Sequence, residues 1–225
     1  MTKQKQAYKS EIRPDLWQDY WLREKRSVLA RFFDKFVGLA MSLLAYPSAV
    51  SIIKKRLPCA SCLEAGCGEA NISSLLAASK KYNIALMDIS GEAIYKAREK
   101  LARYADKIKF LQGDIYYLPF KNKAFDLSLN FGVLEHLDDV VNAVREMRRI
   151  SKVVIATVPS AGPLWRFTIF LRRIVENDSR LWTEQSRLYT KEQMREFFLM
   201  ADCNKVEVYR STLLGLPFLI TAVGS

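Results

Sequence analysis

Short apolar segments alternate with amphipathic segments between residues 62 and 158. The continuous apolar runs Ile84–Met87 and Val153–Ala156 are typical of parallel strands that are buried on both faces. Strands are expected at 62–65, 83–88, 108–112, 125–130 and 153–158, and helices at 72–81, 92–104 and 137–150. This alternation predicts an α/β fold with a doubly wound, mostly parallel sheet.

The first 58 residues have the periodicity of helices, and we expect them to form a basic, helical cap on the domain formed by residues 59–225. Trp17, Tyr20 and Trp21 are three or four residues apart, so they would share one face of the first helix. This aromatic face is expected either to cover a ligand pocket or to dock on the core.

Two further helices are expected in the same region. A wide apolar stripe predicts the first over residues 27–45, and Pro47 is expected to interrupt it before the second forms over 48–57. Residues 1–13 are polar and lack a period, so we expect them to be disordered. The longest uncharged run, Phe36–Ile53, only reaches the minimum length of a membrane-spanning helix and contains Gly and Pro, so a span is not expected.

The alternation stops at residues 160–188, which are expected to be an insertion that serves the substrate site or forms a small subdomain. Beyond it, Thr190 with Gln193 three residues later predicts the start of another helix. Residues 206–209 alternate as a strand, whereas 213–223 fit either a last strand or an apolar tail.

A glycine-rich turn connects the first strand to the helix after it, reading Glu64-Ala-Gly-Cys-Gly-Glu-Ala-Asn71. Two glycines one residue apart let the backbone approach a ligand closely, and the free N–H groups at the helix start would face that ligand. The nicotinamide and flavin fingerprint requires Gly or Ala where this chain has Asn71, so that fingerprint is not met.

Polar residues follow the next three strands of the expected sheet. Asp88 ends the second strand 20 residues after Gly68, Asp114 follows the third, and Asn130 ends the fourth. Ligands of open parallel sheets bind at the carboxyl ends of the strands, where a carboxylate can accept both hydroxyls of a ribose. Each acid alone could instead cap a helix or close a turn, but together they indicate a nucleoside site.

Residues 61–158 resemble the class I S-adenosylmethionine (SAM)-dependent methyltransferases, of the type that acts on small molecules. The matching segments are Leu63–Gly68, Met87–Ser90, Gln112–Ile115, Leu118–Phe120, Phe125–Leu127 and Gly132–Asp138, followed by Tyr189–Met194. The family motif E-x-G-x-G-x-G has Ala70 in place of its third glycine, which would crowd the turn by one methyl group. The resemblance implies a Rossmann-like sheet of seven strands with the last one antiparallel.

The resemblance also implies SAM as the cofactor and assigns residues to it. The amino-acid part of SAM would be held by Glu64, Ala65 and Gly66–Gly68. The ribose hydroxyls would bind Asp88 while Ile89 packs on the adenine, and the adenine edge would meet Asp114 and Ile115. Asn130 would line the methionyl side.

Catalysis of methyl transfer requires mainly a desolvated, aligned acceptor, and in some cases a base. The pair Glu135-His136 contains the one candidate base, His136, although this pair often simply begins a helix in the family. A single histidine excludes a multi-histidine metal site, and no metal is expected. The Asn-Pro-Pro-Tyr motif of exocyclic-amine methyltransferases is absent after the fourth strand, where the chain reads Asn130-Phe-Gly-Val.

The four cysteines do not predict a disulfide framework. Cys59 and Cys62 form a lone C-x-x-C pair, which is either a redox pair or, for residues beside a buried strand, small apolar filling. The polar N-terminus carries no secretory signal, so we expect a cytoplasmic protein, with a peripheral membrane location as the alternative.

The formal net charge is +11, and residues 1–58 contribute twelve Lys or Arg against five Asp or Glu, a net +7. The basic region could bind an anionic partner, either nucleic acid or a membrane surface, or form a solvated face.

The leading prediction is a SAM-dependent methyltransferase for a small acceptor that is apolar at least in part. Its pocket walls would include Trp17, Tyr20, Trp21, Trp165 and Phe167. One alternative keeps the cofactor but directs the enzyme to RNA or membrane lipid through the basic region. The other is a SAM-binding regulator without catalysis, since Ala70 departs from the motif.

Overall fold

The computed structural model describes residues 14–22, 32, 35, 37–57, 60–79, 81–175 and 186–225. The expected disorder of residues 1–13, the first part of the helix expected over 27–45, Cys59 and the end of the 160–188 insertion lie outside the described residues.

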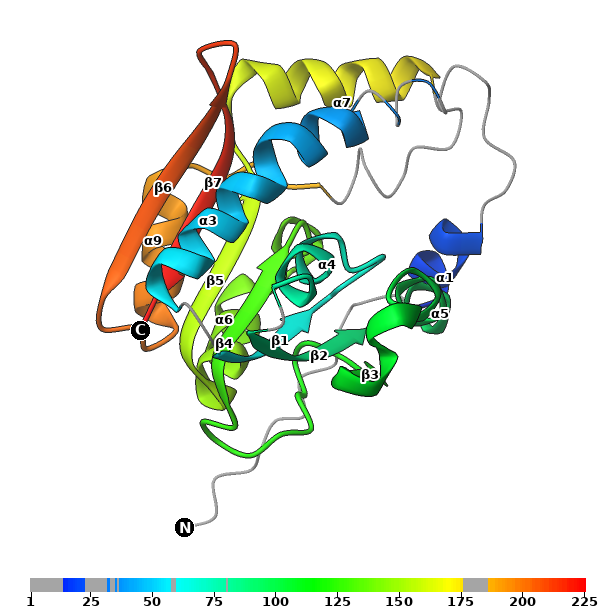
Figure 1. The fold of residues 1–225 in the computed structure, drawn as a ribbon. Coiled ribbons are helices and arrows are strands. Elements are labelled where there is room, and N and C mark those ends of the chain that lie inside the picture. The colour runs from blue at the N-terminus through cyan, green and yellow to red at the C-terminus, as the bar shows by residue number, and fades with distance from the viewer. Residues whose placement is uncertain are drawn as a thin grey trace.

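Seven strands form one sheet in the order β3-β2-β1-β4-β5-β7-β6 (Figure 1). They are β1 (Ala60–Ala65), β2 (Tyr82–Asp88), β3 (Ile108–Gln112), β4 (Phe125–Phe131), β5 (Ser151–Pro159), β6 (Val206–Leu213) and β7 (Leu216–Gly224). Strands β1 to β5 are parallel, while β7 runs antiparallel to both β5 and β6. The expected fold class is confirmed, and 213–223 forms mainly a buried strand rather than a tail. The strand order reverses between β1 and β4, where ligands of such sheets bind.

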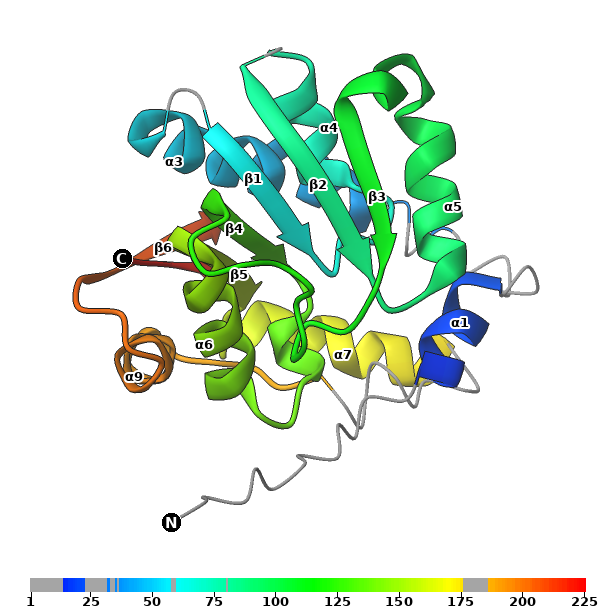
Figure 2. The same cartoon turned by 90° about the horizontal axis from the view of Figure 1, so that it is seen from below.

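Helices cover both faces of the sheet (Figure 2). The helices are α1 (Pro14–Leu22), α3 (Tyr46–Arg56), α4 (Asn71–Ala77), α5 (Gly91–Lys100), α6 (Val140–Ile150), α7 (Pro163–Val175) and α9 (Lys191–Met200). Apolar side chains of α3, α4 and α5 form one core with the sheet, and those of α6 and α9 form a second core on its other face. Burial on both faces explains why the parallel strands are almost continuously apolar.

Side-chain caps set where two helices begin. Thr190 and Gln193 form the expected capping box at the start of α9, which confirms that prediction. The helix expected over 137–150 begins only at Val140, because the Asp139 carboxylate accepts from the Asn142 N–H and caps α6 there. A 3₁₀ turn, Leu134–His136, precedes it and places Glu135 and His136 beside the end of β4.

Pro47 does not interrupt the helical region, contrary to the expectation from sequence. One continuous helix runs from Val37 to Arg56 and contains a π-helical turn at Met41–Ala45, directly before α3. The Tyr46 N–H donates to the Met41 carbonyl five residues earlier, so the chain absorbs one extra residue just before the proline. The proline then occupies the first turn of α3, where its missing N–H is tolerated.

The helix Val37–Arg56 is long and apolar enough to cross a membrane by length and composition, with a mean hydropathy of 1.5 in its most apolar window. Its second half is a core helix, because Ala49, Val50 and Ile53 are buried against α4 and the sheet. Its first half is exposed at Leu39 and Leu43.

Candidate active site

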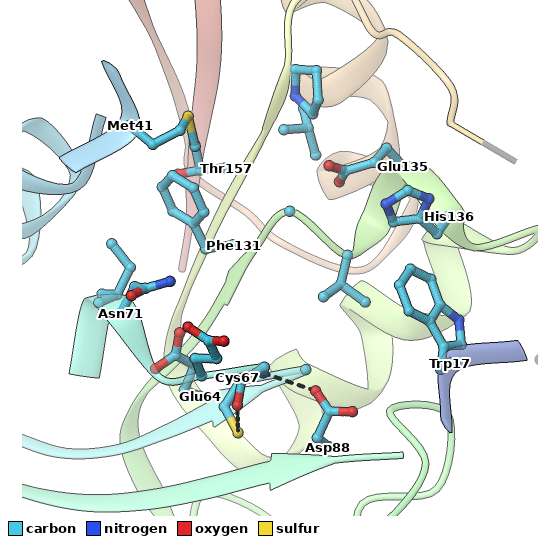
Figure 3. Close-up of a pocket in the computed structure, with 18 of the residues that line it drawn as sticks. Trp17, Met41, Glu64, Cys67, Asn71, Asp88, Phe131, Glu135, His136 and Thr157 are labelled. Atoms are coloured by element: carbon cyan, nitrogen blue, oxygen red, sulfur yellow. Dashed lines mark hydrogen bonds between the residues drawn. The ribbon is translucent and has the colours of Figure 1, made fainter. Parts of the chain in front are cut away.

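A cavity of about 410 Å³ lies at the carboxyl ends of the strands around the β1/β4 reversal. Glu64 and Asp88 lie at one end of it, and Met41, Phe131 and Thr157 at the other (Figure 3). Glu135 and His136 form a third side together with Trp17. The cavity therefore joins the sheet to α1, the long helix and α7, and its volume is in the range of small-molecule sites.

The glycine turn has the left-handed backbone that its sequence suggests. Gly66 has φ +75° and Gly68 has φ +49°, and both line the cavity. The N–H groups of Gly66 and Cys67 both donate to the Met87 carbonyl, at 2.7 and 3.0 Å, which ties the turn to β2. A side chain at Gly66 would collide with Val133, because an added Cβ would lie 2.5 Å from Val133 Cγ2. Only glycine fits at this position.

Ala70, the residue that departs from the family motif, does not touch the cavity. It has φ +55°, is fully buried, and packs in the core formed with α3, α4 and α5. Its methyl group therefore fills core space, and the left-handed conformation costs about 1 kcal/mol.

Two buried carboxylates form the polar end of the cavity. Asp88 accepts from the N–H groups of Gly68 and Ser90, both at 2.9 Å, and is 8% exposed. Glu64 accepts from the Ser73 N–H at 3.2 Å. Burial raises the pKa of Glu64 to about 7 and also raises the pKa of Asp88. A cationic or multi-hydroxyl ligand would lower this desolvation cost, because it supplies charge or donors to both carboxylates.

Met41, Tyr46 and Phe131 line the apolar end of the cavity and were not predicted from the sequence. Tyr46 stands edge-on to Phe131 with ring centroids 5.2 Å apart, and its hydroxyl accepts from Asn71 Nδ2 at 3.3 Å. Met41 and Tyr46 both line the cavity although they are five residues apart. The π turn explains this, because five residues complete about one turn of a π-helix. No sequence periodicity signals a π turn.

Most of the predicted site residues line the cavity. Those that do are Glu64, Gly66, Gly68, Asp88, Ile89, Ile115, His136, Trp17, Tyr20, Trp21 and Trp165. The aromatic face of α1 thus covers the pocket, with Gln18 accepting from Ser90 Oγ at 2.9 Å and holding the helix beside the end of β2.

Four predicted residues do not line the cavity, namely Ala65, Asp114, Asn130 and Phe167. Ala65 is fully buried at the end of β1. The Asp114 carboxylate closes a turn by accepting from the Tyr116 N–H at 2.9 Å. Asn130 is buried and donates from Nδ2 to the Ala65 carbonyl at 2.6 Å, which joins the ends of β4 and β1 below the cavity floor. Phe167 lies on the outside of α7 and is 57% exposed, because it is two positions, or about 200°, from the inward-facing Trp165.

Glu135 has an unsatisfied carboxylate oxygen beside the cavity. It is 3% exposed, and Oε2 has no hydrogen-bond partner among the residues that the structure describes. Burial raises the pKa of Glu135 to about 8, so at neutral pH the carboxyl group is mostly protonated and can donate a hydrogen bond. His136 stands edge-on to Trp17 at 4.9 Å, and its Nδ1 is 3.5 Å from Ser186 Oγ. An unsatisfied buried carboxyl group on a cavity wall is a typical ligand contact.

Replacing Glu135 with glutamine should change how stability depends on pH. The folded-state pKa of about 8 exceeds the ordinary 4.5, so wild-type stability from this group is complete below pH 4.5 and falls as the pH rises to 8. The neutral amide of glutamine does not ionise and so avoids that loss. The free energy of unfolding of Glu135→Gln should therefore rise by a few kcal/mol relative to wild type between pH 5 and pH 9. Urea denaturation across this range measures the difference. Glu99→Gln, at an exposed position of α5, is the control, and a pH-independent difference for Glu135→Gln would contradict the assignment.

Comparison with known proteins identifies the domain. Residues 63–153 match a family model described as "Methyltransferase domain". A "Probable S-adenosylmethionine-dependent methyltransferase" of Mycobacterium tuberculosis is 34% identical over 88 residues, which are 39% of this chain and 30% of that protein. An "eEF1A lysine and N-terminal methyltransferase homolog" of Drosophila pseudoobscura pseudoobscura is 30% identical over 150 residues, which are 66% of this chain and 21% of that protein. The chain thus spans between a fifth and a third of the length of these relatives.

Solved structures share the fold over nearly the whole chain. Magnesium protoporphyrin IX methyltransferase from Synechocystis PCC 6803, with bound SAH, has a TM-score of 0.66 at 16% identity and covers 94% of each chain. A SAM-dependent methyltransferase from Thermotoga maritima has a TM-score of 0.62 at 20% identity, covering 86% of this chain and 96% of the other. The sheet order and the glycine turn agree with the matched model, and residues 63–153 form a methyltransferase domain similar to those of SAM-dependent methyltransferases.

Proposed function

We propose that this protein transfers a methyl group from SAM to a small acceptor with an apolar body and one polar group. The observation that carries the proposal is the single cavity that joins the two strand-end carboxylates to an aromatic wall. One end of the cavity has the chemistry of a nucleoside and amino-acid site, and the other end is apolar.

The cofactor end of the cavity fits SAM on its own geometry. Asp88 accepts the ribose hydroxyls, since a carboxylate keeps free lone pairs beyond the two backbone N–H groups that it already binds. Glu64 faces the ammonium group, whose positive charge offsets the burial of the carboxylate. Gly66 and Gly68 both line the cavity, so the methionine part would lie directly against their backbone.

The acceptor end is formed by Met41, Tyr46, Phe131 and Trp165, with Glu135 on the adjoining side. These side chains hold an apolar body and exclude water from the reacting atoms. The protonated Glu135 carboxyl group donates a hydrogen bond to the polar group of the acceptor and so fixes its orientation. SAM supplies an activated methyl group on its sulfonium, so alignment and desolvation are the main tasks of the protein.

Truncating Met41 should distinguish binding of the cofactor from binding of the acceptor in one experiment. Met41→Ala should leave the affinity for S-adenosylhomocysteine (SAH) within about twofold of wild type, because Met41 lies on the acceptor side. It should raise the acceptor KM about tenfold through lost apolar contact. The measurements are calorimetric titration with SAH and SAH formation from SAM with a panel of water-soluble apolar amines, phenols and carboxylic acids.

Leu43→Ala is the matched control, because Leu43 is exposed on the opposite side of the same helix. A wild-type chain that fails to bind SAH would overturn the proposal. Tight SAH binding with no methyl transfer to any acceptor would favour the alternative of a regulator, which nothing at Ala70 supports, since that residue does not line the cavity.

A further inference from the structure

Three segments at one end of the molecule expose large apolar side chains. On α7, Phe167, Phe170 and Ile174 are 57%, 57% and 66% exposed. The exposed set is completed by Leu39 and Leu43 on the long helix and by Leu214 in the turn between β6 and β7. All three segments lie at the end of the molecule that is uppermost in Figure 1. We call these six side chains the apolar face.

The exposure follows from how the three segments pack. Their inner sides meet in one small core, in which Trp165 stacks on Phe218 and Met41 packs beside them. Phe167, Phe170 and Ile174 are spaced three and four residues apart, so they form a stripe on the side of α7 opposite Trp165. Leu39 and Leu43 lie opposite Met41 in the same way. The folded domain thus needs only the inner sides, and the outer apolar stripes have no role in its core.

The three segments that carry the apolar face have charged residues of one sign within the part of the chain that the structure describes. Residues 35–45, 163–175 and 210–217 contain five Lys or Arg and no Asp or Glu. The nearest acid along β6, Glu207, forms an ion pair with Arg56. A surface that is apolar at its centre and only basic in its charges has the pattern of an interfacial membrane segment.

We propose that the apolar face docks on an anionic lipid bilayer and lies in its interface without spanning it. Leu, Ile and Phe side chains fit among acyl chains, and the basic residues fit anionic headgroups. A second copy of this chain would bring the same positive charge and be repelled. Single-stranded RNA would use stacked aromatics, whereas four of the six side chains are aliphatic. Spanning is excluded because the second half of the long helix is packed in the core.

The docked orientation places the cavity at the bilayer surface. Val37, Gly38 and Met41 line the cavity from the long helix, and Trp165 lines it from α7, so the helices that carry the apolar face also form the cavity wall. This step rests on the methyl transfer proposed above. Given that reaction, the acceptor is an amphiphile that enters from the membrane with its apolar part first.

Vesicle sedimentation tests the docking without any cofactor or acceptor. The full chain is mixed with extruded vesicles of phosphatidylcholine alone, or with about 25 mol % phosphatidylglycerol added. Each Lys or Arg near an anionic surface contributes about a fivefold gain in affinity, so binding should be at least about tenfold tighter to the anionic vesicles and should weaken with salt. Because the assay needs no SAM, the docking and the proposed methyl transfer can fail separately.

Substitution of the apolar face supplies the specific test. Phe167→Ser, Phe170→Ser and Leu214→Ser combined should weaken vesicle binding about a hundredfold or more, while the unfolding temperature stays near that of wild type because all three positions are exposed. The control combines Leu199→Ser, Met200→Ser and Tyr95→Ser, whose large side chains are 47%, 62% and 56% exposed but lie on α9 and α5. Unchanged binding of the first variant, equal loss in the control, or protein that resists extraction with alkaline carbonate would each overturn the proposal.

Discussion

Asp88→Ala should weaken SAH binding at least a hundredfold while the domain stays folded. The Asp88 carboxylate is the one group at the end of β2 that can accept hydrogen bonds from both ribose hydroxyls, and it is held for that purpose by the N–H groups of Gly68 and Ser90. Hydrogen bonds to a charged group contribute about 1.5–3 kcal/mol each, so the loss of two should lower the affinity for SAH by about a hundredfold or more. Calorimetric titration with SAH measures the loss.

Two controls separate binding from folding in this experiment. Asp88→Asn keeps one acceptor oxygen and should lose only about tenfold in affinity. The unfolding temperature of Asp88→Ala should change by only a few degrees. Burial disfavours the charged carboxylate and raises its pKa, and the substitution removes this desolvation cost. SAH binding by Asp88→Ala within about threefold of wild type would show that the ribose lies elsewhere.

Gly66→Ala should destabilise the protein by about 2–4 kcal/mol and abolish measurable SAH binding. The new Cβ would lie 2.5 Å from Val133 Cγ2, at a backbone φ of +75° that alanine rarely adopts. The collision and the left-handed strain each cost about 1–2 kcal/mol. The turn must also shift, which moves backbone that faces the cofactor. Urea denaturation and SAH titration measure the two effects.

A second substitution distinguishes the collision from the strain. Gly66→Ala combined with Val133→Ala removes the branched side chain that the new Cβ would meet, so it should recover about half of the lost stability. Val133→Ala alone is the reference, because Val133 also lines the cavity. If the double variant is as unstable as the sum of the two single variants, the contact with Val133 is not the cause.

The sequence was sufficient for the parallel part of the fold and for the polar end of the site. Parallel strands buried on both faces leave long apolar runs, and Asp88 follows one of them at a fixed distance from the glycine turn. The capping box at Thr190 is equally local, since both partners lie within one turn of helix.

The acceptor end was less predictable because it depends on contacts between distant segments. Met41 meets Trp165 and Leu219 across more than a hundred residues, and the π turn that directs Met41 inward leaves no periodic signal. Glu135 appears in the sequence only as half of a helix-entry motif, and its importance comes from burial with an unsatisfied oxygen. Asp114 and Asn130 were predicted for the site but have structural roles, because polar residues at strand ends also close turns and join strands.

The π turn at Met41–Ala45 divides the long helix into two parts with different packing. The part after the turn is fixed in register by Ala49, Val50 and Ile53 in the core, whereas the part before it carries the cavity wall and the exposed leucines. Loss of one residue from the turn would restore a regular helix and rotate everything before it by about 100°. A single codon deletion could therefore exchange the cavity-facing side chains in one step, and thus change acceptor selectivity, while Ala49, Val50 and Ile53 keep their places in the core.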